Sequence, residues 1–183
     1  MKITNNILTK NRFSRPNKKL IGVRGVVIHW IGNAGTSALM NRNYFENLKN
    51  QRVTNNARYA SAHFIIGLEG EIIQCLPANE WAYHVGARSY KNDALKRLSS
   101  YPNNCTLGIE LCHPDWTGKF NDATIASAIE LTALLLKQFN LTPNDIYRHY
   151  DITGKLCPKY FVENTRAWIE FKSSVEKYLI SIL

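Results

Sequence analysis

Short apolar blocks separated by polar ones run along the chain, and they predict strands that alternate with helices. The apolar run GVVIHWIG (25–32), bounded by glycines, predicts a buried strand that ends at a histidine. Two further strands, at 63–67 and 71–76, are predicted to form a hairpin through Glu69 and Gly70. Other extended segments are predicted at WAYHVGA (81–87), TLGIELC (106–112) and DIYRHYD (145–151).

Three segments have the apolar spacing of helices. They are 38–49 after a Ser37 cap, 122–139 after an Asn121 cap, and a C-terminal helix at about 164–182. Interleaved strands and helices favour an α/β fold with a central mixed β-sheet flanked by helices. No repeat or linker divides the 183 residues, so a single domain over 1–183 is predicted, with its core at about 20–165.

Composition excludes some classes of protein and leaves others open. No run approaches the ~20 apolar residues of a membrane span, and the polar, basic N-terminus lacks the apolar core of a signal peptide. The net charge is +9, and eight basic residues precede the first acidic residue, Glu46. This charge favours an anionic partner, such as nucleic acid, membrane or wall polymer, although a solvated basic tail explains it equally well. No motif for stacking on bases or reading a groove supports nucleic acid.

The candidate chemistry lies in RHYDITGKLCPKYF (148–161). His149 is followed after eight positions by Cys157, in a loop where a thiol is expected to be exposed. Lys155 is expected to favour the thiolate form of this cysteine. With His29, which ends the first strand, these residues make the set of two imidazoles and one thiolate that suits a catalytic zinc. Taken alone, His29 is more typical of a core histidine.

Four segments together resemble the zinc-dependent N-acetylmuramoyl-L-alanine amidases of the type-2 family, which includes phage lysozyme-type amidases and peptidoglycan recognition proteins. The segments are VVIHWIGN, SAHFIIGLEGEIIQCLPANEWAYHVGA, TLGIELC and RHYDITGKLCPKYF. They follow the family's order and span about 25–161, and they are most similar to endolysins and autolysins that act on Gram-positive walls. The resemblance therefore implies peptidoglycan as the substrate and Zn²⁺ as the cofactor.

The resemblance also assigns roles to residues. It implies that the metal ligands are His29, His149 and Cys157. It places the family's lysine at Lys155 and its strand glutamate at Glu110. Some members have a catalytic tyrosine where this chain has Ala62, which makes a phenol-based mechanism doubtful here.

The residues themselves support these roles. Glu110 lies mid-strand among apolar neighbours, where a carboxylate is costly unless it is paired or near a metal. It is predicted to carry the proton between attacking water and leaving amine, while Lys155 stabilises the oxyanion. The resemblance implies that His84 contacts substrate, because its position faces the substrate groove in the family. Trp30 and Asn33 are predicted to line the groove beside His29.

The leading hypothesis is an enzyme that hydrolyses the amide between the lactyl group of N-acetylmuramic acid and L-alanine. The alternative is a non-catalytic peptidoglycan-binding module of the same fold, but such modules usually lack the cysteine ligand, and Cys157 is present. A cytosolic wall-recycling amidase ranks below an endolysin because its relatives tend to have aspartate as the third ligand. An endolysin without a signal peptide is expected to stay in the host cytoplasm until it is released to the wall, where anionic polymers are further candidate partners.

Overall fold

One six-stranded sheet organises the fold in the computed structural model, which describes residues 1–183. Its strands are β1 (Ile3–Asn5), β2 (Gly25–Trp30), β3 (Phe64–Ile66), β4 (Ile72–Gln74), β5 (Thr106–Leu111) and β6 (Ile146–Arg148). They are ordered β1-β4-β3-β5-β2-β6 across the sheet. Only the β3–β4 hairpin is antiparallel, and the other neighbours run parallel. The predicted mixed sheet and its hairpin are confirmed.

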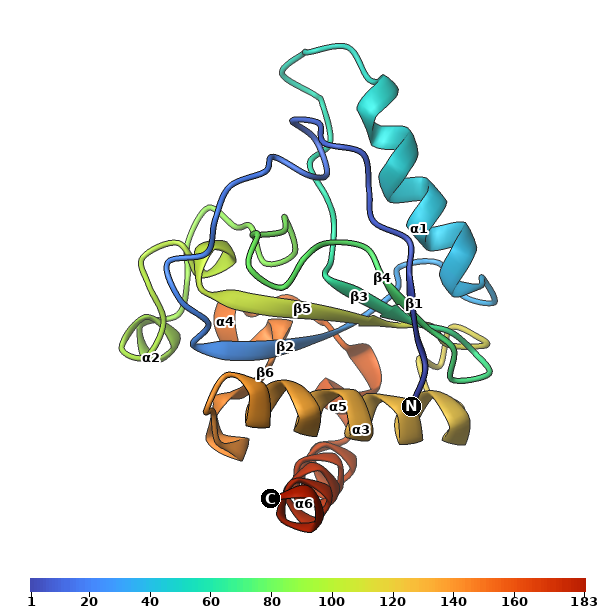
Figure 1. Ribbon diagram of the computed structural model, residues 1–183, viewed down its shortest axis with the longest axis vertical. Helices are drawn as coiled ribbons and strands as arrows, with labels where there is room; N and C mark the ends of the chain where they lie inside the picture. The colour runs from blue at the N-terminus through green and yellow to red at the C-terminus, as the bar shows by residue number, and fades with distance from the viewer.

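Six α-helices surround the sheet (Figure 1). They are α1 (Ala38–Asn47), α2 (Asn92–Leu95), α3 (Asp122–Gln138), α4 (His149–Thr153), α5 (Lys159–Glu163) and α6 (Thr165–Ile182). Single 3₁₀ turns occur at η1 (Leu48–Asn50), η2 (Pro102–Asn104) and η3 (Pro143–Asp145). The three predicted helices are all present, and none of the helices has the length and apolarity needed to cross a bilayer.

Helix α3 contacts one face of the sheet and α6 packs on α3, and Figure 1 shows both helices below the sheet. Alternate residues of β5, Leu107, Ile109 and Leu111, point into this layer and are fully buried. They share one core cluster with Leu131 of α3 and Trp168 of α6. Burying each large apolar side chain contributes about 1.5–3 kcal/mol, so this layer stabilises the sheet that carries the site.

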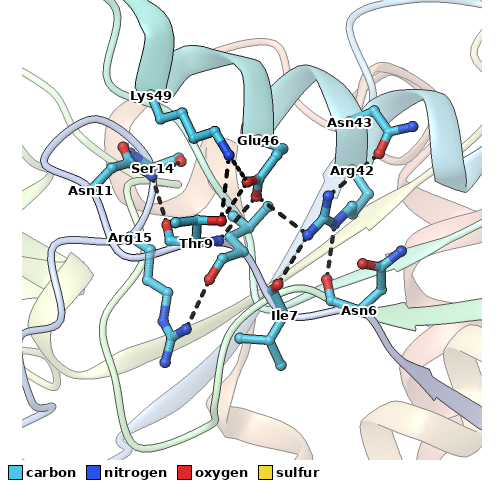
Figure 2. A network of polar contacts seen from close by, with 11 residues as sticks. Asn6, Ile7, Thr9, Asn11, Ser14, Arg15, Arg42, Asn43, Glu46 and Lys49 are labelled. Carbon is cyan, nitrogen blue, oxygen red and sulfur yellow. Dashed lines mark hydrogen bonds and ion pairs between the residues drawn. The ribbon is translucent and has the colours of Figure 1, made fainter.

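The opposite face is covered by α1 and by the N-terminal segment. Ile65 of β3 and Ile73 of β4 pack there with Phe45 of α1 and with Leu8. Polar contacts hold the N-terminal segment against α1 (Figure 2). The Glu46 carboxylate accepts hydrogen bonds from the backbone N–H of Thr9 at 3.0 Å and from its hydroxyl at 2.6 Å.

Three local expectations differ from the structure. His149 does not close a strand, because β6 ends at Arg148 and His149 is the first residue of α4. The segment 81–87, which was predicted to be extended, has no regular secondary structure, and the Asn103 side chain accepts hydrogen bonds from the backbone N–H groups of His84 and Val85. Asn121 occupies the cap position of α3, but its side chain donates to the Leu68 carbonyl instead of capping the helix.

Candidate metal centre and active-site groove

Three side chains with metal-binding atoms meet at one edge of the sheet. His29 lies near the end of β2, and His149 follows β6, which pairs with β2 in parallel. The carboxyl ends of parallel strands meet at one edge, so the fold itself brings these two imidazoles together. Their ring centroids are 4.8 Å apart.

Cys157 reaches the same point through a sharp reversal of the chain. Helix α4 ends at Gly154, whose φ of +83° lies in the left-handed region that favours glycine. The chain then turns back, and the backbone N–H of Tyr150 donates to the Cys157 carbonyl at 2.9 Å. This bond places the thiol beside the first turn of α4.

The donor atoms fit a zinc ion. One atom from each of His29, His149 and Cys157 lies within 4.8 Å of the others, and all three residues are buried. The Cys157 sulfur is 3.7 Å from Nδ1 of His29. A tetrahedral zinc with ordinary bond lengths places a nitrogen and a sulfur ligand about 3.6 Å apart. The set leaves one tetrahedral position for water or substrate.

A chain of hydrogen bonds selects the tautomer of His29. The Thr106 hydroxyl donates to the Pro102 carbonyl at 2.7 Å, so it must accept from Nε2 of His84, 3.1 Å away. Nδ1 of neutral His84 is then an acceptor, and Nε2 of His29 donates to it at 2.9 Å. The lone pair of His29 therefore lies on Nδ1, which faces Cys157. A hydrogen bond that orients a ligating imidazole in this way is typical of metal sites.

Burial keeps the imidazoles in the neutral form that binds metals. It lowers the pKa of His149 to about 4, and it lowers the pKa values of His29 and His84 well below their ordinary range. The thiol was expected to be exposed, but Cys157 is only 2% exposed. Lys155 lowers the pKa of the thiol as expected, but burial outweighs this effect and raises the pKa to about 12. A thiolate at this position therefore needs a bound cation.

Glu110 faces the same side of the sheet, because it pairs in register with His29 across β2 and β5. Burial raises the pKa of its carboxyl to about 8. Its Oε2 is inaccessible and has no hydrogen-bond partner, which is rare for a native polar atom. A group of this kind can take up or release a proton near neutral pH.

These residues line one large groove of about 1070 Å³. The three predicted substrate contacts, Trp30, Asn33 and His84, line this groove, and so does Lys155, which is predicted to stabilise the oxyanion. His84 is only 7% exposed and both its ring nitrogens contact protein groups, and its contact with substrate stays a prediction. The role of Lys155 also stays a prediction, although its charge acts on all three candidate ligands and on Glu110.

Two further histidines are buried but lie outside the ligand set. Nδ1 of His63 accepts from the Gly108 backbone N–H at 3.0 Å, and its Nε2 donates to the Glu80 carbonyl at 2.7 Å. Each ring nitrogen of His113 lies 2.6 Å from a backbone carbonyl, and the ring stacks on Trp30. Neither histidine has a nitrogen free for a metal.

The aromatic wall of the groove was not predicted from the sequence. Its members are Tyr44, Tyr59, Tyr83, Tyr101 and Trp116. They come from five separate places in the chain, and no period links them. The partly exposed rings offer stacking surfaces and hydroxyl groups, which suit a ligand that is both apolar and polar.

Comparison with known proteins agrees with this arrangement. The family described as N-acetylmuramoyl-L-alanine amidase matches residues 17–160. The chain belongs to the N-acetylmuramoyl-L-alanine amidase family. A probable N-acetylmuramoyl-L-alanine amidase of Bacillus licheniformis is 36% identical over 179 residues, which cover 98% of this chain and 48% of the relative. The amidase BlyA of Bacillus subtilis (strain 168) is 33% identical over 94% of this chain and 46% of its own length.

The fold of this amidase-family chain is also known from solved structures. A mutant endolysin from Bacillus subtilis superimposes with a TM-score of 0.70 at 22% identity, covering 95% of this chain and 98% of that one. The chain spans about half the length of the curated relatives it matches.

Proposed function

We propose that this chain is a zinc-dependent amidase that hydrolyses the bond between the lactyl group of N-acetylmuramic acid and L-alanine in peptidoglycan. The observation that carries this proposal is the meeting of three metal-binding side chains and one unpartnered carboxyl in a single groove. His29, His149 and Cys157 would hold the zinc. When bound, zinc supplies Lewis-acid chemistry, polarising a carbonyl and making water more acidic.

Glu110 supplies the proton transfers. Its carboxylate takes a proton from the water whose oxygen attacks the amide carbon, and the same proton then goes to the nitrogen of L-alanine as the C–N bond breaks. The products are a free lactyl carboxyl group and a new amino group. A raised pKa suits this double role, because the group must both accept and release a proton at neutral pH.

Lys155 stabilises the negative charge that develops on the amide oxygen. Two observations support this role: its side chain is exposed in the groove, and its positive charge acts on the candidate ligand His29. The neighbouring aromatic side chains offer surfaces on which the sugar and the first amino acids can lie.

The wall is proposed to be of the Gram-positive type, and the enzyme to act as an endolysin or autolysin. The relatives from Bacillus species support this proposal. The +9 charge supports a contribution from anionic wall polymers.

The test is hydrolysis of purified walls, followed by labelling of newly exposed amino groups. We expect new N-terminal L-alanine, loss of activity with a zinc chelator, and recovery when zinc is restored. Cys157→Ala should lose both zinc and activity. Cys75→Ala is the matched control, since Cys75 is also a buried free thiol but lies outside the groove.

Two results would contradict the proposal. Wall binding without new amino groups would identify a binding module of the same fold. Full activity in the Cys157→Ala variant would exclude the proposed ligand set.

A further inference from the structure

A second hollow of about 570 Å³ lies next to the active-site groove. Tyr59 and Tyr83 line both, and their rings meet edge to face with centroids 5.4 Å apart. The second hollow is otherwise formed by one continuous segment of the N-terminal third. This basic hollow is lined by Lys10, Asn11, Arg12, Arg15, Pro16, Asn17, Lys18, Tyr59 and Tyr83.

The charges around the basic hollow are mostly unbalanced. Lys10, Arg12 and Lys18 are exposed, and none of them forms an ion pair with a carboxylate. Arg15 differs, because its guanidinium makes two hydrogen bonds to the Glu80 carboxylate, at 2.8 and 2.9 Å. Three exposed cations therefore surround one hollow without a direct ion pair to a carboxylate, although the charge of Lys10 also acts on Glu80.

The segment that carries these cations is held in one shape. The Asn11 side chain accepts hydrogen bonds from the backbone N–H groups of Phe13 and Ser14, at 2.8 and 2.9 Å. Arg15 also donates to the Leu8 carbonyl at 2.8 Å. The pair of Arg15 with the buried Glu80 anchors the segment to the loop after β4. If the N-terminal segment were only a solvated basic tail, it would not need these contacts.

We propose that the basic hollow binds phosphate groups of an anionic polymer attached to the wall, so that the polymer lies beside the peptidoglycan strand in the groove. This inference rests on the proposed function. Cations spread along one segment fit a chain of repeating charges better than a single carboxylate. The shared tyrosine wall connects the hollow to the site of wall cleavage, which favours a wall polymer over nucleic acid.

The test is a binding measurement with soluble poly(glycerol phosphate), and it needs no turnover. The protein is compared with a triple variant, Lys10→Gln, Arg12→Gln and Lys18→Gln. The matched control is Lys96→Gln, Arg166→Gln and Lys177→Gln, which removes the same charges from exposed positions on α6 and at the end of α2. Thermal melting checks that both variants are folded.

We expect the basic-hollow variant to bind at least about tenfold more weakly at low salt, and the control to stay within about twofold of wild type. Higher salt should remove the difference, because the screening length falls to about 3 Å at 1 M. Polyglutamate, a carboxylate polymer, and a single-stranded oligonucleotide serve as competing polyanions.

Three outcomes would overturn the inference. They are equal weakening in both triple variants, no binding of poly(glycerol phosphate) by the wild type, or equal affinity for polyglutamate or the oligonucleotide. Because binding is measured without hydrolysis, each of these results leaves the amidase proposal untouched. Failure of the amidase proposal would appear as missing amino groups with polymer binding intact.

Discussion

Replacing Glu110 with glutamine should stabilise the metal-free protein. In the protein with zinc restored, the same change should remove most of the activity. The change keeps the size and shape of the side chain but removes its charge. In the wild type, Glu110 is a half-buried residue of the groove wall, and its Oε2 is inaccessible and has no hydrogen-bond partner. An ionised group there is unfavourable without a bound cation. The ionised Glu110 carboxyl therefore lowers the free energy of unfolding of the metal-free protein.

The size of this cost follows from the pKa. Burial raises the pKa of Glu110 from 4.5 to about 8. Between these two values the folded protein holds a proton that the unfolded chain has lost, so its stability falls as the pH rises. At about 1.4 kcal/mol per pKa unit, the total is on the order of 5 kcal/mol. The Glu110→Gln variant has no carboxyl to ionise and does not lose this stability. Its gain in stability over the wild type should therefore be small below pH 4.5 and reach its full size above pH 8.

Urea unfolding of chelator-treated protein at pH 5 and pH 8.5 measures the effect. With a slope of about 1–3 kcal/mol per molar urea, a gain of this order moves the midpoint by more than about 1.5 M at pH 8.5. At pH 5 we expect a much smaller shift. With zinc restored, turnover should fall by about 10²–10⁴-fold, which is the usual contribution of a general acid–base group.

Glu176→Gln is the matched control, because Glu176 is exposed on α6 and lies outside the groove. It should change neither the midpoint nor the rate. Equal midpoints for wild type and Glu110→Gln at pH 8.5 would refute the argument from burial. A rate close to that of the wild type would refute the proton-transfer role, whatever happened to stability.

Three further changes test other parts of the structure. His84→Ala should weaken zinc binding by about 10–100-fold in chelator competition, because Nε2 of His29 loses the acceptor that selects its tautomer. An unchanged zinc affinity would contradict the role of His84 in positioning His29. Although burial opposes it, hydrogen bonds from Lys49 and Thr9 lower the pKa of Glu46 to about 2. Glu46→Gln should therefore cost about 1–2 kcal/mol of stability at pH 7, and less as the pH falls from 4.5 towards 2; a cost independent of pH would contradict this. Trp168→Ala should cost about 3–5 kcal/mol in urea unfolding, since the ring is buried and stacks on Phe171, and a loss below 1 kcal/mol would show that α6 is dispensable.

The main strands and helices were predictable because each has a period or a boundary that is visible locally. β2 is a continuous apolar run, and α3 and α6 repeat apolar residues along one face. The missed elements are short. β1 has three residues and exists because it pairs with β4, while α2, α4 and α5 have four or five residues each. Helices of this length depend on tertiary contacts and carry little signal in the sequence.

The candidate ligands were predictable for a different reason. His29 lies near the end of β2 and His149 directly follows β6, so parallel pairing brings both to one edge, and Cys157 follows shortly after α4. The environment of these atoms was not predictable. The burial of Cys157 and the contact between His84 and His29 depend on segments that are far apart in sequence.

Ala62 links the sequence to the mechanism. Some family members have a tyrosine at this position, but here the side chain is a fully buried methyl group in the core cluster beneath α1. It cannot donate or accept a proton. Glu110 is the one acidic residue among the groove-lining residues, and its carboxyl has a pKa of about 8. The proposed proton transfer therefore rests on Glu110, whose Oε2 has no hydrogen-bond partner and which β5 holds in register with His29 of β2.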